Sequence, residues 1–460
     1  MKIAVLGAGP GGYEAAIYAA KRGAEVVLIE KATGEFGGTC LNRGCIPTKA
    51  FLASYDTLET VENAKDLGIN INGDVTIDFK YIQDRKKKVV STIVNGVAFL
   101  MKKNKVTVVN GFGKLVDRNT IDVTKDDGTV ETVKADYIII ATGSVPTTPA
   151  TMGYNKKRII TSDEILDFEE APKSMILIGG GVIGVEIGQF FGKMGTEVTV
   201  VQGGKQLLPT MDEDVAKQLQ RQFKKDKINV VLGERVKGAV DNGDNVTVSL
   251  ESGKELTADY ALVAIGRRPF TEGCGFEEAG VVMTDKGRVK VNEFLQTNYD
   301  NVYSIGDVST PIMLAHVASW EGILAVDNIF GAGRKVEYHA VPSCVFTNPE
   351  IAQVGETEAS LQAAGKEYKV GKFDFKGLGK AIASGHTAGF VKVITDMNDV
   401  LIGAAIVGAR ATDMMQVLTN GVFYHQTATE IGAAIYPHPT MGEAVMEALH
   451  DLHGLSINKG

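Results

Sequence analysis

The sequence predicts an α/β protein with two Rossmann-like dinucleotide-binding domains and a C-terminal α+β dimerisation domain. A strand, glycine loop, helix and strand occur in order near residue 7 and again near residue 179. After about residue 337 the pattern changes to strands mixed with helices. Glycine accounts for 53 of 460 residues, an excess that loops approaching a ligand closely would explain.

The first unit spans residues 2–30 and contains the glycine motif GAGPGG. A strand precedes the motif, a helix follows it, and a second strand ends at Glu30. In such a unit Gly7 turns the chain, Gly9 admits a pyrophosphate to the helix N-terminus and Gly12 packs helix on strand. Glu30 is placed to accept ribose hydroxyls. This context makes the motif far more specific than a bare GxGxxG.

The second unit, residues 174–201, repeats this pattern with Gly179, Gly181 and Gly184 in its loop. Similar strand-and-turn segments, DYIIIATGSVP and DYALVAIGRRP, follow the two units. The chain is therefore interpreted as a diverged repeat that binds two dinucleotides, one a held cofactor and one a substrate. The second strand ends at Gln202, where an acid is expected for NAD.

Changes in pattern divide the chain into four predicted segments. We expect one dinucleotide-binding domain over 1–148, a second over 149–269, a central segment over 270–336 that completes the first domain, and an α+β domain over 337–460. A Pro/Thr-rich stretch, VPTTPATMG, separates the first two.

Charge and composition exclude several classes of protein. The 48 basic and 56 acidic residues give a net charge of −8, which disfavours nucleic acid and anionic membranes as partners. Four cysteines are too few for a disulfide scaffold, and no uninterrupted apolar segment is long enough to span a membrane, so a cytoplasmic protein is expected. The basic run 85–88 is interpreted as a solvated helix face.

The segment GGTCLNRGCIPTK holds Cys40 and Cys45. In a regular helix, residues five apart are separated by about 7.5 Å along the axis and about 140° around it. A disulfide needs Cα atoms within roughly 7 Å, so this pair can bridge only if the backbone is distorted. Nearby glycines permit that distortion, and a thiolate at a helix start is reactive. Zinc is disfavoured for lack of a second matching pair, and inert thiols are the remaining alternative.

This segment resembles the redox-active segment of the flavin-dependent pyridine nucleotide–disulfide oxidoreductases. The resemblance covers essentially the whole chain through both fingerprints, ATGS, GRRP, IGD, MLAH and HPTMGE. Within the family it is greatest to the enzymes that oxidise dihydrolipoamide. Glutathione and mercuric ion reductases tend to carry valine where this chain has Leu41, and the mercuric and thioredoxin enzymes add a C-terminal cysteine pair that the tail HDLHGLSINKG lacks.

The resemblance implies a role for each thiol. Cys45 is expected against the flavin and Cys40 toward the disulfide substrate. Lys49 matches the family lysine near the flavin, and Glu186 matches the acid that pairs with it. The further residues that the resemblance assigns to cofactor binding are Thr39, Gly113, Thr142, Gly143, Ser144, Val236, Gly266, Asp307, Met313, Leu314, Ala315 and His316.

Thiol–disulfide exchange also needs a base, because only the thiolate attacks. His438, between two prolines and five residues before Glu443, is the candidate among seven histidines. A carboxylate bonded to one ring nitrogen orients the imidazole and stabilises the imidazolium. In the family this His–Glu dyad reaches across a homodimer interface into the other subunit's disulfide site.

The resemblance thus implies an FAD-dependent enzyme that oxidises dihydrolipoamide through a Cys40–Cys45 disulfide and reduces NAD. It assigns FAD binding to residues 1–148, NAD(P) binding to 149–269 and dimerisation to 337–460. Because Gln202 is neutral and Lys205 follows it, NADP is an alternative acceptor. The expected partners are the lipoyl-carrying proteins of 2-oxo-acid dehydrogenase or glycine-cleavage complexes. Two alternatives stay open: a flavoprotein reductase of another low-molecular-weight disulfide, resembling glutathione reductase, and a flavoprotein scaffold without turnover.

Overall fold

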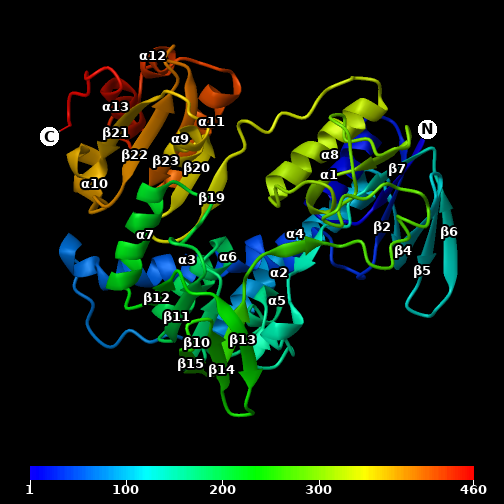
Figure 1. Cartoon of the computed structure of the whole chain (residues 1–460), viewed down its shortest axis with the longest axis horizontal. Coiled ribbons are helices and arrows are strands. Elements are labelled where there is room, and N and C mark those ends of the chain that lie inside the picture. Colours follow the sequence, from blue (N-terminus) through cyan, green and yellow to red (C-terminus); the bar gives the residue numbers. More distant parts are fainter. Residues whose placement is uncertain (460) are drawn as a thin grey trace.

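A computed structural model describes residues 1–459, in which three lobes surround a central region (Figure 1). The first lobe is built on a parallel sheet with strand order β18-β7-β1-β2-β3. Its strands are β1 (Lys2–Leu6), β2 (Glu25–Glu30), β3 (Thr107–Asn110), β7 (Tyr137–Ile140) and β18 (Val302–Ser304). Their apolar runs are almost wholly buried, as expected for parallel strands covered on both faces.

The second lobe is built on a parallel sheet with strand order β12-β11-β10-β16-β9. Its strands are β9 (Ile159–Ile160), β10 (Ser174–Ile178), β11 (Glu197–Gln202), β12 (Asn229–Leu232) and β16 (Tyr260–Val263). Its helices are α5 (Ser162–Ile165), α6 (Val182–Lys193) and α7 (Glu213–Lys225).

The two lobes repeat each other in detail. Each adds an antiparallel sheet: β4 (Phe112–Asp117), β5 (Thr120–Thr124) and β6 (Val130–Lys134) in the first, and β13 (Val236–Asp241), β14 (Val246–Leu250) and β15 (Glu255–Ala258) in the second. The Gly7 amide donates to Ile29 O at 2.8 Å, and the Gly179 amide donates to Val201 O at 2.9 Å. The predicted fold class and diverged repeat are confirmed.

Helices α1 (Pro10–Lys21) and α8 (Ala315–Ile329) pack side by side on the first sheet. Their backbones approach so closely that a Cβ added at Gly322 would lie 2.6 Å from Gly11 O. A short turn, η3 (Gly306–Val308), precedes α8, and the strands β8 (Ser144–Pro146) and β17 (Arg267–Pro269) pair between the lobes. Helix α8 is therefore fixed beside the first glycine loop.

Helices α2 (Gly38–Arg43), α3 (Cys45–Glu62) and α4 (Phe79–Lys103) follow β2. The interpretation of residues 85–88 as a solvated face is wrong for Lys86, which is only 3% exposed. Its Nζ lies 3.0 Å from Asp167 Oδ1, and it lies over the Phe51 ring. Helix α4 packs on α3, so the aliphatic part of this lysine is buried while its charge meets a carboxylate.

The C-terminal lobe is an antiparallel sheet with strand order β19-β20-β23-β22-β21. These strands are β19 (Ser343–Val345), β20 (Ile351–Gly355), β21 (Lys369–Asp374), β22 (Phe390–Thr395) and β23 (Leu401–Val407). The helices of this lobe are α9 (Glu358–Ala363), α10 (Gly379–Ser384), α11 (Ala411–Phe423), α12 (Ala428–Gly432) and α13 (Glu443–Asp451). Helices α11 and α13 pack on the sheet around one apolar core.

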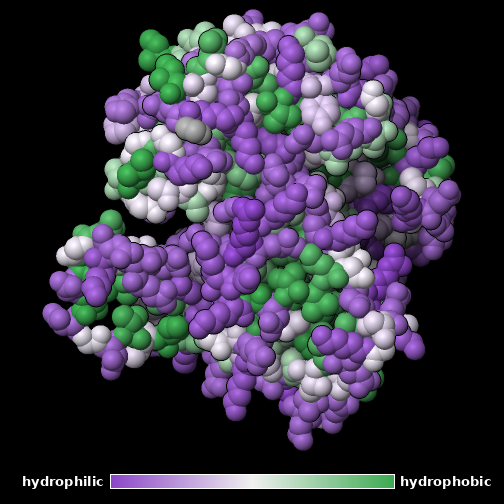
Figure 2. All heavy atoms as spheres, turned by 60° about the vertical axis from the view of Figure 1, so that its left-hand side comes forward, coloured by the Kyte–Doolittle hydropathy of each residue, from purple (hydrophilic) through white to green (hydrophobic). Residues whose placement is uncertain are grey.

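Most side chains on the face shown in Figure 2 are hydrophilic, and the hydrophobic ones gather in separate patches. Within residues 1–459, no helix has the length and apolar character needed to cross a membrane.

Candidate active site

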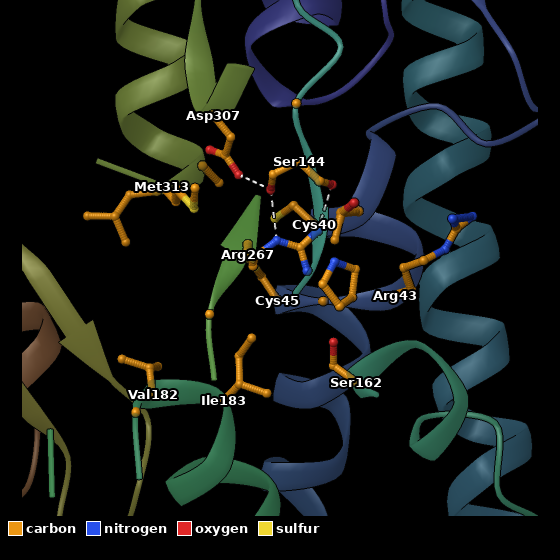
Figure 3. A pocket seen from close by; sticks show the side chains of 18 of the residues that line it. Cys40, Arg43, Cys45, Ser144, Ser162, Val182, Ile183, Arg267, Asp307 and Met313 are labelled. Atoms are coloured by element: carbon orange, nitrogen blue, oxygen red, sulfur yellow. Dashed lines mark hydrogen bonds between the residues drawn. The ribbon is translucent and has the colours of Figure 1, made fainter. Parts of the chain in front are cut away.

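A cavity of about 1250 Å³ lies where the three lobes meet. Both glycine loops line it, together with α2, α3, the segment 305–316 and parts of the C-terminal lobe. Figure 3 shows Asp307, Ser144 and Arg267 in one part of the cavity and Val182 and Ile183 of the second loop in another. The volume exceeds the roughly 300–1,000 Å³ of an ordinary ligand pocket, so there is room for more than one ligand.

The first glycine loop has the shape that a dinucleotide requires. A Cβ added at Gly12 would lie 1.9 Å from Gly7 O, so helix and strand can pack only with glycine there. At Gly9 an added Cβ would meet nothing within 4 Å, which leaves the helix N-terminus open to the cavity. The Glu30 carboxylate accepts from the Ala8 amide at 2.8 Å. Open helix amides and a fixed carboxylate fit the pyrophosphate and ribose of FAD.

The second loop has the same geometry with one chemical difference. A Cβ added at Gly184 would lie 2.1 Å from Gly179 O, and Gly181 is open. Gln202 Oε1 accepts from the Gly180 amide at 3.0 Å, the counterpart of the contact that Glu30 makes with Ala8. Gln202 therefore holds the loop as an acid would, without the negative charge.

Asp307 is held in a network that links both lobes. Ser144 Oγ donates to Asp307 Oδ2 at 2.5 Å, and Arg267 Nε donates to Ser144 Oγ at 2.8 Å (Figure 3). Burial lowers the pKa of Arg267, and Asp307 and Asp163 oppose this effect. An arginine stays charged under such a shift, so the cavity contains a fixed cation beside Asp307.

The two cysteines lie together because the helix is broken between them. Helix α2 ends at Arg43, Gly44 adopts φ −148° and ψ −112°, and α3 begins at Cys45. The distortion expected from the spacing is thus present, and both cysteines are free thiols. The two thiols lie close enough for each to shift the pKa of the other.

This contact separates the acidities of the two thiols. Hydrogen bonding with Cys40 lowers the pKa of Cys45 to about 7 against the opposing effect of burial, and the Lys49 ammonium lowers it further. Hydrogen bonding with Cys45 and burial raise the pKa of Cys40. Cys45 is therefore the thiolate of the pair, and Cys40 needs a base before it can react.

Lys49 connects the thiols to the second lobe. Its Nζ donates to Glu186 Oε2 at 2.8 Å and lies 4.4 Å from the centre of the Phe346 ring. Glu186, with a side chain 4% exposed, also accepts from the Phe346 amide at 2.8 Å. The buried carboxylate is thus satisfied on both oxygens, and it fixes the cation one helical turn after Cys45.

His438 lies outside the cavity. Its Nδ1 lies 2.8 Å from Glu443 Oε1, and Glu443 Oε2 accepts from the Thr440 amide at 2.9 Å. Burial would raise the pKa of Glu443, but the hydrogen bonds from His438 and Thr440 lower it. The His438 side chain is 78% exposed, and Ile435 nearby is 99% exposed. The dyad is therefore assembled, but it lies outside the cavity that contains this chain's own thiols.

The structure brings most of the expected site residues onto one wall or another of the cavity. The expected residues that do not line it are Gly113, Gly184, His438 and Glu443. Gly113 lies in β4, where its α-carbon faces Leu6. Residues that line the cavity without having been singled out from the sequence include Arg43, Ser162, Asp163, Arg235, Arg267 and Cys344. Of these, Arg43 and Arg267 carried a signal, since Arg43 belongs to the GGTCLNRGCIPTK segment and Arg267 to the GRRP segment.

Comparisons with known proteins agree with this geometry. The family model described as pyridine nucleotide-disulphide oxidoreductase matches residues 1–322, and the model of that family's dimerisation domain matches residues 341–449. The chain therefore belongs to the pyridine nucleotide-disulphide oxidoreductase family, as the sequence predicts.

Two relatives and two solved structures are similar to this chain over nearly its full length. The chain is 41% identical to a dihydrolipoyl dehydrogenase of Bacillus subtilis (strain 168) over 459 residues, covering 99% of this chain and 97% of the relative. It is 40% identical to the mitochondrial dihydrolipoyl dehydrogenase of Pisum sativum, covering 97% and 90% of the two chains. Among solved structures, LpdA from Mycobacterium tuberculosis matches with a TM-score of 0.92 at 27% identity, covering 98% and 99%. The flavoprotein disulfide reductase RclA from Escherichia coli matches with a TM-score of 0.86 at 25% identity, covering 98% and 99%.

Proposed function

We propose that this chain oxidises dihydrolipoamide carried on a protein and passes the electrons through FAD to a nicotinamide dinucleotide. The observation that carries the proposal is the Cys40–Cys45 pair, which opens into the cavity lined by both glycine loops. Relatives named dihydrolipoyl dehydrogenase, matching nearly the full length, support this substrate over other disulfides.

The thiol chemistry follows from the two acidities. In the oxidised pair, a substrate thiolate attacks Cys40 Sγ, which forms a mixed disulfide and releases Cys45 as a thiolate. The second substrate thiol gives its proton to a base and attacks the substrate sulfur of the mixed disulfide. Lipoamide forms, and Cys40 leaves and is protonated. Cys45 is suited to leave because its pKa is lowered to about 7.

The base is proposed to be His438 of a second copy of the chain. His316 is the one histidine among the described residues that line the cavity, and its Nε2 lies 2.9 Å from Pro342 O. His438 has a carboxylate partner and lies in the segment that matches the dimerisation model. The exposed apolar side chain of Ile435 beside it favours cover by another protein surface. A homodimer would place each dyad at the other chain's thiols.

The first loop, Glu30 and Asp307 would hold FAD, and Cys45 and Lys49 line the same cavity. When bound, a flavin supplies the two-electron chemistry that links a dithiol to a nicotinamide. Lys49 keeps a positive charge at Cys45, and Glu186 keeps Lys49 in place. Met313 and His316 line the same region of the cavity.

The second loop would bind NAD, with NADP as a usable alternative. Gln202 carries no charge to repel a 2′-phosphate. Arg235 lines the cavity beside Gly203, where it would attract that phosphate, but Glu234 and Glu251 line the cavity too. Because Arg235 would attract the 2′-phosphate and the two glutamates would repel it, the proposed preference for NAD over NADP is small.

The partners are proposed to be lipoyl-carrying proteins of 2-oxo-acid dehydrogenase or glycine-cleavage complexes. A cytoplasmic location is proposed because four cysteines in 460 residues are too few for a disulfide scaffold, which suits a reducing compartment.

Anaerobic titration of the purified protein with dihydrolipoamide tests the proposal. The expected result is loss of flavin absorbance at its main band and growth of long-wavelength absorbance from a thiolate beside the flavin, followed by NADH formation when NAD is added. A protein that is reduced by glutathione but not by dihydrolipoamide would instead be a reductase of another disulfide. A Cys40→Ser protein that keeps full turnover would overturn both.

A further inference from the structure

Glu321 is a carboxylate with no exposure to solvent, on the face of α8 that meets the first lobe. Its Oε2 accepts from the Gly306 amide at 2.6 Å, and its Oε1 accepts from the Tyr338 hydroxyl at 2.5 Å. Burial raises the pKa of Glu321 to about 7, although both hydrogen bonds oppose the rise. Burying a carboxylate costs free energy, so we expect Glu321 to have a specific role in the protein.

The contact with Gly306 fixes the turn that carries Asp307. Gly306 has a φ of +69°, and a Cβ added to it would lie 3.1 Å from Ala318 Cβ. Gly306 and Asp307 line the cavity, whereas Glu321 lies behind them. Since Asp307 accepts from Ser144 at 2.5 Å, the direction of its carboxylate depends on a turn whose first amide is held by Glu321.

The contact with Tyr338 fixes Glu321 itself. Tyr338 lies in the segment between α8 and β19, and its ring lies edge-on to Trp320 with centroids 6.1 Å apart. The same segment is tied to α8 again where His316 Nε2 meets Pro342 O at 2.9 Å. The Glu321 carboxylate thus connects the turn η3, which carries Asp307, to the segment that leads into the C-terminal lobe.

We propose that Glu321 is a positioning residue for the flavin site, acting through Gly306 on Asp307, with Tyr338 as its orienting partner. The inference rests on the proposed FAD site in the first lobe. It predicts that flavin affinity depends on an acceptor at position 321, although this side chain does not reach the cavity.

Four variants test it: Glu321→Ala, Glu321→Gln, Tyr338→Phe and the control Asp327→Ala. Asp327 lies on the same helix, is 8% exposed and accepts from the Tyr18 hydroxyl at 2.9 Å and from Arg334 at 2.8 Å, but it does not contact Gly306. The readouts are the Kd of FAD for the flavin-free protein, from quenching of flavin fluorescence, and the visible spectrum of the bound flavin. Both are measured at a temperature where far-UV circular dichroism shows each variant folded.

Glu321→Ala is expected to weaken FAD binding about tenfold or more, because the Gly306 amide is left buried without its acceptor. Glu321→Gln, whose amide oxygen can accept from Gly306, is expected to bind within about threefold of the parent. Tyr338→Phe is expected to weaken binding by an intermediate factor, and Asp327→Ala to lower thermal stability with the FAD affinity kept.

Unchanged affinity in Glu321→Ala, or equal losses in the alanine variants of Glu321 and Asp327, would overturn the inference. If Glu321→Ala does not fold, parent-like affinity in Tyr338→Phe would overturn it in the same way. A parent protein that binds no FAD would overturn the proposed function itself, so the two failures are distinguishable.

Discussion

Lys392 Nζ lies 2.9 Å from the Asp212 carboxylate, and both side chains are at least 96% buried. Asp212 caps α7 in the second lobe, whereas Lys392 lies in β22 of the C-terminal lobe. Asp214 at 3.3 Å and Glu358 at 2.5 Å complete the surroundings of the ammonium group. A buried cation of the C-terminal lobe thus pairs with carboxylates at the start of α7 in the second lobe.

Replacing this cation with Lys392→Met should lower the free energy of unfolding by about 3–5 kcal/mol, because the carboxylates around it lose their counter-charge. Hydrogen exchange should quicken first in α7. Lys372→Met is the control, since Lys372 contacts Asp214 at 3.1 Å but is 36% exposed and should contribute only about 1 kcal/mol or less. Equal unfolding midpoints for the two variants would contradict the prediction.

Removing the charge at Lys49 should raise the pKa of Cys45, because the ammonium group stabilises the thiolate. The measurement is the pH dependence of iodoacetamide alkylation in a Cys40→Ser background. Cys274 and Cys344 add little signal below pH 9, because burial raises the pKa of each to about 11. Lys49→Gln should shift the midpoint upward, and Lys49→Arg should not. If both variants keep the parent midpoint, Lys49 does not set the acidity of Cys45.

His438→Ala should lower turnover by about 10² or more, the usual contribution of a general base. Complementation separates action across the dimer from action within one chain. When His438→Ala and Cys40→Ser chains are mixed and reassociated, each mixed dimer regains one intact pair of thiols and base, so about a quarter of the parent activity should return. If activity does not return although mixed dimers form, His438 does not serve the other chain's thiols.

Coenzyme choice should respond to charge at position 202. Gln202→Glu should reduce kcat/KM for NADP relative to NAD by at least about tenfold, because a carboxylate would face the 2′-phosphate. Arg235→Ala should reduce the use of NADP and leave the use of NAD near the parent level. Lys205→Ala is the matched control, since Lys205 is exposed and does not line the cavity. If the unmodified enzyme has a much higher kcat/KM for NADP than for NAD, the proposed preference for NAD is wrong.

The features that the sequence predicts well are local ones. The glycine loops can be recognised because spacing and flanking strands dictate their shape, as the near contact of Gly12 with Gly7 O shows. The break between Cys40 and Cys45 follows from their spacing and from Gly44. The burial of Lys86 could not be predicted, because it depends on how α4 packs on α3.

Long-range contacts account for what the sequence does not reveal. Glu321 and Tyr338 belong to no motif, and their connection to Gly306 exists only after α8 has packed beside the first sheet. Arg267 belongs to a recognisable segment, but its hydrogen bond to Ser144 crosses 123 positions of the chain. His438 lies outside the cavity, and the residue pattern around it does not encode where it lies relative to this chain's own thiols.

An acid at position 202 would both accept from the Gly180 amide and place a negative charge near the nucleotide, whereas Gln202 does only the first. Holding the Gly180 amide requires only an oxygen, whereas selecting between nucleotides requires a charge. Glutamine and glutamate codons differ by a single base. On the role proposed for position 202, one mutational step would alter the preference between NAD and NADP without rebuilding the loop.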